Sequence, residues 1–161
     1  MTTDKEQFWD IIAELSVCMV TTRDGGVMRS RPMAPYIDKG ARTIQFMTDG
    51  DSAKVFELDA NQDIALSFSN PGKMLFASVS GRGVVSRDRA LIKELWGSYA
   101  DVFFGGNPEE ADVAIVKIEP TQAEFWDNRG GKIAMAAELT RAYFTDHGPN
   151  LGENVKLDTV T

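Results

Sequence analysis

The sequence contains little of the chemistry on which metal sites and hydrolases depend. Among 161 residues there is one cysteine, Cys18, and one histidine, His147. A single thiol excludes an intramolecular disulfide, and one Cys with one His makes a zinc site improbable, so we expect no metal. His147 lies in the polar segment TDHGPN, and no nucleophile-elbow motif is present, which argues against a Ser-His-Asp hydrolase. Cys18, within the apolar run VCMV, is expected to be a core residue.

Long apolar runs and blocks of like charge are also absent. No stretch of about 18 apolar residues occurs, and the first residues, MTTDKEQFWD, are polar, so we expect a cytoplasmic protein without a signal peptide or membrane segment. The net charge is −7, from 17 basic and 24 acidic residues, and no five like charges are consecutive. This balance disfavours nucleic acid and anionic membranes as partners. Any anion that binds must therefore be held by a few well-placed groups.

The pattern of apolar residues predicts one mainly β domain over residues 1–161. The turn Arg23-Asp24-Gly25-Gly26 between two apolar segments is typical of a hairpin, and the segment 63–70 alternates apolar and small polar residues as a half-buried strand does. A few sequential strands with short helices between them favour an antiparallel β-barrel of six or seven strands with peripheral helices. The predicted strands are 17–22, 27–37, 43–48, 63–70, 74–86, 112–120 and 121–128, the last two joined at Pro120.

Helices are predicted where apolar residues recur three or four positions apart. Thr3 or Asp4 can cap the first helix, Ser52 the second and Asp88 the third. After the third helix, Trp96 and Tyr99 are expected in the core or at a subunit contact, with a ligand groove as the alternative. Residues 145–161 are expected to be loop with one short terminal strand at most. The predicted helices are 4–15, 52–61, 88–96 and 131–144.

The segment RSRPMAPY, residues 29–36, is an unusual strand. Side chains alternate between faces, so Arg29, Arg31 and Met33 share one side. Pro32 and Pro35 donate no backbone hydrogen bond, which confines the segment to a sheet edge. One interpretation is an edge strand protected from aggregation by charge and proline; the other is a surface that binds a ligand.

The segment FMTDGDSAKVFEL, residues 46–58, favours the ligand. A strand that ends at Thr48 leads through a tight turn into a helix that begins near Ser52 and Lys54. Free amides at a helix N-terminus, a hydroxyl and an ammonium group together suit a phosphate. With Arg29 and Arg31 on a neighbouring strand, the two segments predict a cradle for a phosphate monoester.

Three segments in this order, RSRPM, FMTDGDSAKVFEL and FGGNPEEADVAIVKIEPTQAEFWD, resemble the FMN-binding split barrels related to pyridoxamine 5′-phosphate oxidase, in particular their general stress protein branch. The resemblance covers nearly the whole chain and includes LGEN, residues 151–154. It implies a homodimer with FMN bound at the subunit interface. It also implies a flavin-dependent oxidoreductase that uses a small-molecule electron donor or substrate.

The resemblance assigns roles to individual residues. Arg29 and Lys54 would contact the phosphate with help from Thr48 and Ser52, and Trp126 of the partner subunit would approach the ring. Arg31, Pro32 and Met33 would lie along the isoalloxazine ring with their backbone groups meeting its polar edge, and Met47 stands where the oxidases have an aromatic residue. The complete predicted cofactor site is Arg29, Ser30, Arg31, Pro32, Met33, Met47, Thr48, Ser52, Lys54 and Trp126.

Two departures from the true oxidases argue against oxidation of pyridoxamine phosphate. Ala53 stands where those enzymes have an arginine, and their basic, histidine-bearing C-terminal motif has no counterpart here. The sequence identifies no catalytic residue. A non-catalytic FMN carrier or redox and stress sensor is therefore one alternative, and a barrel that binds a deazaflavin or haem is another.

Overall fold

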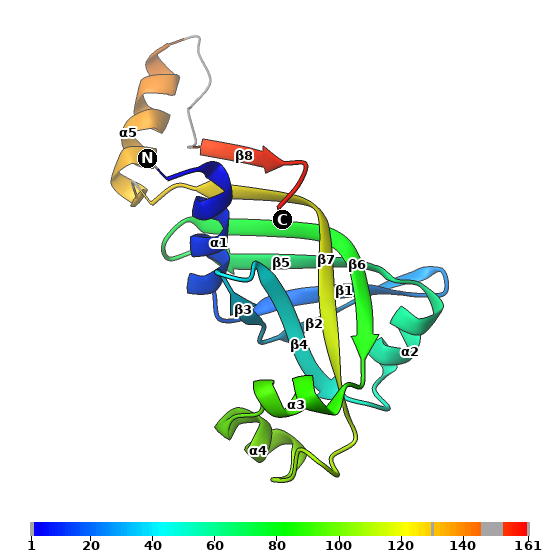
Figure 1. Ribbon diagram of the computed structural model, residues 1–161. Helices are drawn as coiled ribbons and strands as arrows, with labels where there is room; N and C mark the ends of the chain where they lie inside the picture. The colour runs from blue at the N-terminus through cyan, green and yellow to red at the C-terminus, as the bar shows by residue number, and fades with distance from the viewer. Residues whose placement is uncertain (1, 130, 146–152, 161) are drawn as a thin grey trace.

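A computed structural model describes residues 2–129, 131–145 and 153–160 (Figure 1). His147 lies outside these residues. The elements are α1 (Asp4–Glu14), β1 (Cys18–Asp24), β2 (Val27–Met33), β3 (Tyr36–Asp38), β4 (Thr43–Asp49), α2 (Ala53–Ala60), β5 (Asp63–Asn70), β6 (Leu75–Ser86), α3 (Arg89–Leu95), α4 (Ser98–Phe104), β7 (Val113–Asp127), α5 (Gly131–Phe144) and β8 (Glu153–Leu157).

The strands form one strongly curved antiparallel sheet, which confirms the mainly β barrel with peripheral helices. The described strands number eight, in the order β2-β1-β5-β6-β7-β4-β3, and β8 pairs with β7. The two ends of this order, β2 and β3, are consecutive in the chain and are joined only by Ala34 and Pro35. The chain therefore connects the two end strands covalently, but β2 and β3 are not paired in the described sheet, so the barrel is split between them.

Two predicted strand boundaries were wrong, and proline explains both. The expected strand 27–37 is divided into β2 and β3 because Pro35 has no N–H with which to continue a ladder. The expected strands 112–120 and 121–128 are one strand, β7, which continues through Pro120. The pairing of β6 with β7 shifts register between Ser80 and Gly81, and Gly81 is paired with Pro120. A bulge leaves one backbone group unpaired, so it can accept a residue that has no donor.

Gly81 is required at this bulge by a close backbone contact. A Cβ atom built on Gly81 would lie 2.3 Å from the backbone oxygen of Glu119 and 3.0 Å from the Cα atom of Pro120. Side-chain atoms do not approach backbone so closely, so only glycine fits here. The bend allows β7 to pair with β4 at its start and with β8 at its end (Figure 1).

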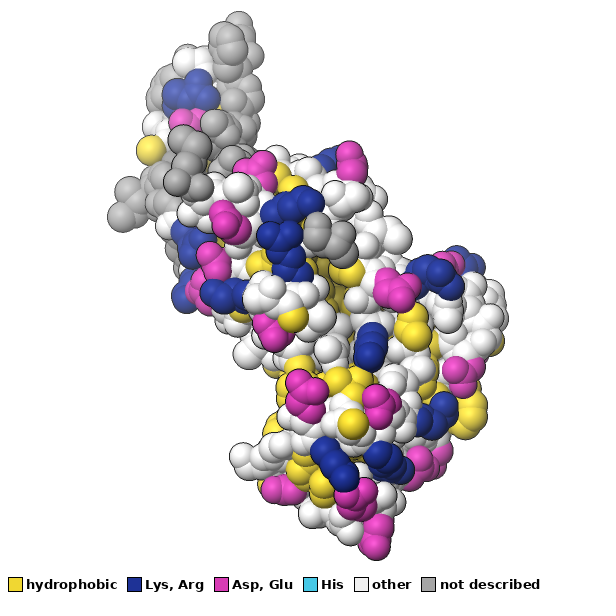
Figure 2. All heavy atoms as spheres, in the orientation of Figure 1, with side chains coloured by type: hydrophobic (Ala, Val, Ile, Leu, Met, Phe, Trp, Pro, Cys, Tyr) yellow, Lys and Arg dark blue, Asp and Glu magenta, His cyan; other side chains and the backbone are white. Residues whose placement is uncertain are grey.

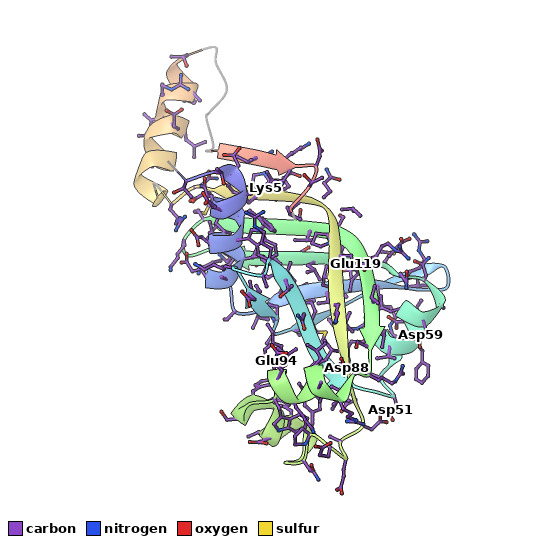
Figure 3. The ribbon with its side chains drawn as sticks, in the orientation of Figure 1. Lys5, Asp51, Asp59, Asp88, Glu94 and Glu119 are labelled. Carbon is purple, nitrogen blue, oxygen red and sulfur yellow. The ribbon has the colours of Figure 1, made fainter. Side chains whose placement is uncertain are left out.

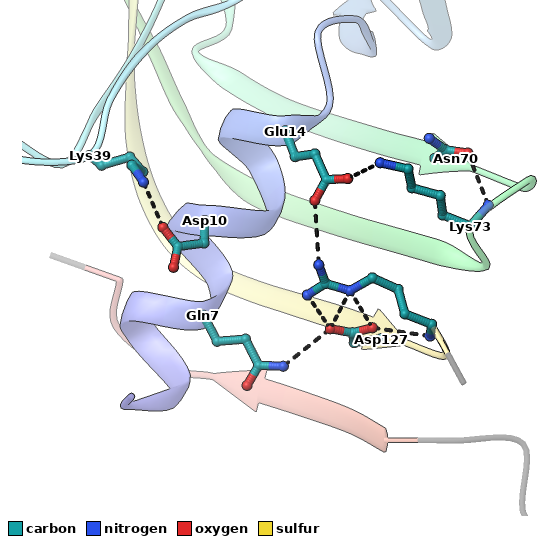
Figure 4. Close-up of polar contacts among 8 residues, drawn as sticks. Gln7, Asp10, Glu14, Lys39, Asn70, Lys73 and Asp127 are labelled. Carbon is teal, nitrogen blue, oxygen red and sulfur yellow. Dashed lines mark hydrogen bonds and ion pairs between the residues drawn. The ribbon is translucent and has the colours of Figure 1, made fainter. Parts of the chain in front are cut away.

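The main core fills the barrel and is covered at one end by α1. Phe8, Ile11 and Ile12 of α1 are fully buried, and Thr3 caps the helix in a capping box with Glu6. Polar contacts on the outer side of α1 hold it to the strands (Figure 4). These contacts are Asp10 with Lys39 at 2.7 Å, Glu14 with Lys73 and with Arg129 at 3.4 Å, and Gln7 with Asp127 at 3.4 Å.

A second, smaller core lies between the sheet and the pair α3 and α4 (Figure 1). Met47 of β4 and Ile115 of β7 pack there against Ile92 of α3 and Ala100 of α4. The helix α3 agrees with the prediction and begins at its Asp88 cap, whereas α4 was not predicted. The predicted helix 131–144 and the short terminal strand are present as α5 and β8. No helix in the described part of the chain is both long and apolar enough to span a bilayer.

Candidate functional site

A pocket of about 470 Å³ opens at the split in the barrel. Its walls come from β2, the link to β3, the start of α2, one residue of β4 and the helix α4. The lining residues are Arg29, Arg31, Pro32, Met33, Ala34, Pro35, Tyr36, Met47, Ala53, Lys54, Tyr99 and Phe104. The volume lies in the range of about 300–1,000 Å³ typical of small-molecule sites.

The arginines reach the pocket because β2 continues an inward-facing row of side chains. Arg29 is paired with Thr22 and Arg31 with Val20, both of which are buried. Directly paired residues in antiparallel strands point to the same face of a sheet. Because β2 is an end strand, this face extends past the core into the pocket, and the side chain of Arg31 is 20% exposed against 50% for Arg29.

The beginning of α2 adds an ammonium group and two hydroxyls. Lys54 Nζ donates to Thr48 Oγ1 at 2.6 Å, and Thr48 Oγ1 lies 3.3 Å from Ser52 Oγ. Ser52 is the N-cap residue of α2, but among the described residues its side chain makes no capping hydrogen bond. The Val55 amide donates to the Ser52 carbonyl at 3.0 Å, so the first-turn amides that can be offered to an anion are those of Ala53 and Lys54.

The electrostatics of the site centre on Glu57, which is only 6% exposed. Arg31 Nη2 donates to both carboxylate oxygens, at 3.1 and 3.0 Å, and Thr22 Oγ1 donates to Oε2. Arg29 Nη1 lies 3.5 Å from Oε1, and Arg31 also donates to Thr22 Oγ1. Glu57 thus accepts hydrogen bonds from three side chains, those of Thr22, Arg29 and Arg31.

The pKa shifts reflect this crowding of charge. Burial lowers the pKa of Lys54, and the positive charge of Arg31 lowers it further. Burial alone raises the pKa of Glu57, but the hydrogen bonds from Thr22 and Arg31 outweigh it, so the pKa lies below its ordinary value. The group thus brings three basic side chains, Arg29, Arg31 and Lys54, together with two carboxylates, those of Glu57 and Asp24, which leaves an excess of one basic group.

The rest of the pocket lining is mostly apolar and aromatic. Met33 and Met47 contribute deformable apolar surface, Tyr99 and Phe104 come from α4, and Tyr36 comes from the start of β3. Burial, and to a smaller extent Tyr99, raises the pKa of Tyr36, so its phenol stays protonated at neutral pH. A ligand with an anionic end and a flat apolar end matches this division.

Most of the residues predicted from the sequence lie together, but not all. Thr48 and Ser52 adjoin the pocket through Lys54, whereas Ser30 lies on the other face of β2, where its hydroxyl contacts Thr21. Trp126 is not among the residues that line this pocket; it lies half-buried near the far end of β7, paired with Phe76 and Asn154. Six of the predicted cofactor residues line the pocket: Arg29, Arg31, Pro32, Met33, Met47 and Lys54.

Sequence reasoning missed Glu57 and the aromatic wall. An acidic residue in a short helix is normally solvated, as are Asp51 and Asp59 at the two ends of α2 (Figure 3). No local signal distinguishes Glu57 from these two residues, because its burial depends on contacts with β1 and β2. Tyr99 was expected chiefly in packing, and the unpredicted helix α4 brings it to the pocket.

On the face of the molecule drawn in Figure 2, no extensive basic patch is seen, in agreement with the absence of a block of like charges in the sequence. Figure 2 shows acidic and basic side chains interspersed over one face of the molecule. Together, the fold and the pocket define a split antiparallel barrel with a cationic recess at its open edge. The model of the family described as pyridoxamine 5′-phosphate oxidase like matches residues 3–150, and the chain belongs to this family.

Comparison with individual proteins gives the same family relationship. The chain is 30% identical over 134 residues to protein bli-3 of Neurospora crassa, which covers 74% of this chain and 64% of bli-3. The chain therefore matches less than two thirds of the length of that curated relative.

Two solved structures are similar over most of this chain. A general stress protein 26 from Jannaschia sp. has 28% identity and a TM-score of 0.75, over 95% of this chain and 96% of that one. A general stress FMN/FAD binding protein from Xanthomonas citri has 26% identity and a TM-score of 0.68, over 77% of this chain and 88% of that one. The general stress branch expected from the sequence is thus represented among its structural relatives.

Proposed function

We propose that this chain binds FMN in the pocket between β2, α2 and α4 and acts as a flavin-dependent oxidoreductase. The observation that carries the proposal is that three basic side chains, Arg29, Arg31 and Lys54, share one pocket with apolar and aromatic side chains. In a chain with net charge −7, three cations around one recess need a local reason. The relative from Xanthomonas citri is an FMN/FAD binding protein, which supports the same cofactor here.

The residues present fit the phosphate of FMN. The recess holds more basic groups than carboxylates, and a phosphate monoester carries about −1.5 to −2 at neutral pH. Lys54, Thr48 and Ser52 supply an ammonium and two hydroxyls beside the start of α2. The recess therefore offers a phosphate an excess of basic groups and several hydrogen-bond donors.

The residues also fit a flavin ring. Pro32, Met33 and Met47 offer an apolar surface to a flat ring system. In the described chain β2 pairs on one side only, with β1, so backbone groups along its other edge have no strand partner. These groups can bond to the polar edge of the ring. When bound, FMN would supply the capacity to accept and return electrons.

The chain's own residues would bind and orient the cofactor. Arg29 and Lys54 would fix the phosphate, and the strand edge would fix the ring. The aromatic residues of α4 would exclude water from one side of the pocket. A small electron donor, such as a reduced nicotinamide, would complete the reaction.

A second candidate, a non-catalytic FMN carrier or redox sensor, is favoured by one observation. The described residues that line the pocket include no Asp, Glu or His, and the phenol of Tyr36 stays protonated. Apart from Lys54, whose pKa burial lowers, that lining therefore offers no carboxylate or imidazole as a general acid or base. A site for deazaflavin or haem is the third alternative, and haem would need an axial ligand.

The homodimer is part of the proposal because the pocket is open on one side. Trp126 lies at the other end of β7 from this chain's own pocket, so it would serve the partner subunit's ring. Light scattering is expected to give twice the mass of 17.7 kDa. A monomer that binds FMN tightly would contradict the shared site. The cytoplasmic location likewise stays a prediction.

The decisive experiment is a spectrum and mass analysis of the compound that copurifies with the protein. Flavin absorbance and the mass of FMN are expected; a deazaflavin or haem spectrum would refute the proposal. Addition of reduced nicotinamide then separates the first two candidates. Rapid bleaching of the flavin supports an oxidoreductase, and no change over minutes supports a carrier or sensor.

A further inference from the structure

Glu57 is an unexpected residue at the base of a site for an anion. Its side chain is 5% exposed, and its carboxylate lies within 3.5 Å of both Arg29 and Arg31. Its negative charge opposes that of a phosphate bound on the other side of those arginines. Glu57 must therefore contribute something other than attraction.

Stability alone is a weak reason for this buried ion pair. Apolar residues of similar volume often replace such a pair with no loss of stability. What a carboxylate adds is direction, because it accepts hydrogen bonds from a guanidinium only in particular orientations. Here Arg31 donates to both oxygens of Glu57 and to Thr22, which closes a ring of three side chains.

We propose that Glu57 is a positioning residue that holds the guanidinium groups of Arg31 and Arg29 in place for a phosphate monoester. Arg31 is fixed by its contacts with Glu57 and Thr22, and Arg29 is fixed between Glu57 and Asp24, whose Oδ2 lies 3.2 Å from Arg29 Nη1. The ligand then meets guanidinium groups that are already ordered, which reduces the entropy cost of binding. That this phosphate belongs to a flavin rests on the proposed function.

Two effects of Glu57 on phosphate binding have opposite signs. Its charge weakens binding, whereas its fixed hydrogen bonds strengthen it. Glu57→Gln removes the charge and one of the two acceptor oxygens at once, so its result alone is ambiguous. Glu57→Asp keeps the charge but shortens the side chain by one methylene, so the carboxylate no longer reaches both arginines. This variant separates position from charge.

The experiment compares ligands with and without the phosphate. Dissociation constants for FMN and riboflavin are measured by flavin fluorescence for the wild type and for Glu57→Asp. We expect FMN to bind about tenfold more weakly to the variant, the factor typical of one lost charge-assisted hydrogen bond. Riboflavin affinity is expected to stay within about twofold, because no phosphate contact is involved.

A matched control is Glu119→Asp, the same substitution at an exposed position of β7 (Figure 3). It is expected to leave both affinities unchanged. Equal weakening of FMN and riboflavin by Glu57→Asp would indicate general damage to the pocket and overturn the inference. Wild-type FMN affinity in Glu57→Asp would also overturn the inference, because it would show that the position of the carboxylate does not affect phosphate binding.

Inorganic phosphate keeps this inference separate from the proposed function. The increase in melting temperature with phosphate is measured for the same proteins, and Glu57→Asp should need about tenfold more phosphate to reach the same increase. If the wild type responds to phosphate but binds no flavin, the proposed function fails and the role of Glu57 stands. If the wild type binds FMN and Glu57→Asp responds like it, only the role of Glu57 fails.

A second variant covers the case in which Glu57→Asp does not fold. Arg31→Lys keeps the positive charge and leaves Glu57 intact, but an ammonium cannot contact Glu57, Thr22 and a phosphate in the same fixed geometry. Its FMN affinity is expected to fall about tenfold. Riboflavin affinity is expected to stay unchanged, because the substitution leaves in place the strand backbone that would meet the ring. Wild-type FMN affinity in Arg31→Lys would show that guanidinium geometry has no role.

Discussion

Lys54→Met is expected to separate cofactor binding from stability. Lys54 Nζ bonds to Thr48 at 2.6 Å, faces Arg31 across the recess, and is available to a phosphate. Its loss removes one charge-assisted contact, which corresponds to about 1.5–3 kcal/mol of binding free energy. The dissociation constant of FMN should therefore rise by about 10- to 150-fold.

The same substitution should not reduce the stability of the protein without cofactor. Burial and Arg31 lower the pKa of Lys54, so the folded state disfavours the charged form relative to the unfolded chain. The charged lysine therefore reduces stability at neutral pH, and this cost disappears only as the pH rises above the folded pKa. Methionine keeps most of the apolar stem, so the melting temperature of the cofactor-free variant should equal or exceed that of the wild type.

The assay is fluorescence titration with FMN together with thermal unfolding without ligand. Lys39→Met is a matched control, because it makes the same change in net charge at an exposed ion pair with Asp10. It is expected to leave FMN binding unchanged. Wild-type affinity in Lys54→Met would remove this residue from the site. Weak binding with a clearly lower melting temperature would show instead that Lys54 acts through the fold.

Three further predictions test other parts of the molecule. Arg29→Ala should weaken FMN binding by about 1.5 kcal/mol, the lower end of the range for such contacts, since this side chain is half-exposed and shared with Asp24; titration at wild-type affinity would contradict this. Gly81→Ala should reduce the free energy of unfolding in urea by about 1–3 kcal/mol, because its Cβ would overlap the backbone of Glu119, and an unchanged urea midpoint would refute the close contact. Cys18 should not react with a thiol reagent at pH 8 until the protein unfolds, because burial raises its pKa to about 12; rapid reaction of the native protein would contradict that burial.

Local sequence patterns predicted most of the fold but not its irregular positions. The hairpin of β1 and β2 followed from Asp24, Gly25 and Gly26, and the alternation of β5 followed from period two. The single long strand β7 did not follow, because a proline ordinarily ends a strand and the bulge that accepts Pro120 is supplied by another strand. The helix α4 was missed because Gly97 resembles a stop signal and the apolar partners of α4 lie on β4 and β7.

The candidate site shows the same division. Arg29 and Arg31 could be singled out because cations and prolines are unusual in a strand, and Lys54 because it stands with Ser52 at a helix start. The pairing of these two segments favoured a ligand over a protected edge strand. Glu57 could not, since its burial depends on where β1 and β2 lie relative to α2. An ion pair between residues of separate elements, such as Glu57 with Arg31, leaves no periodic signal in a single sequence. The predicted role of Trp126 depends on a second subunit.

The two-residue link between the end strands also sets the width of the recess. Three steps of about 3.8 Å join the Cα atoms of Met33 and Tyr36, so these atoms cannot move more than about 11 Å apart. Both residues and the link itself line the pocket. Thermal motion can loosen the helices around the ligand, but this short connection limits how far the strand side of the recess can widen. The recess is therefore better suited to a flat ligand than to a bulky one.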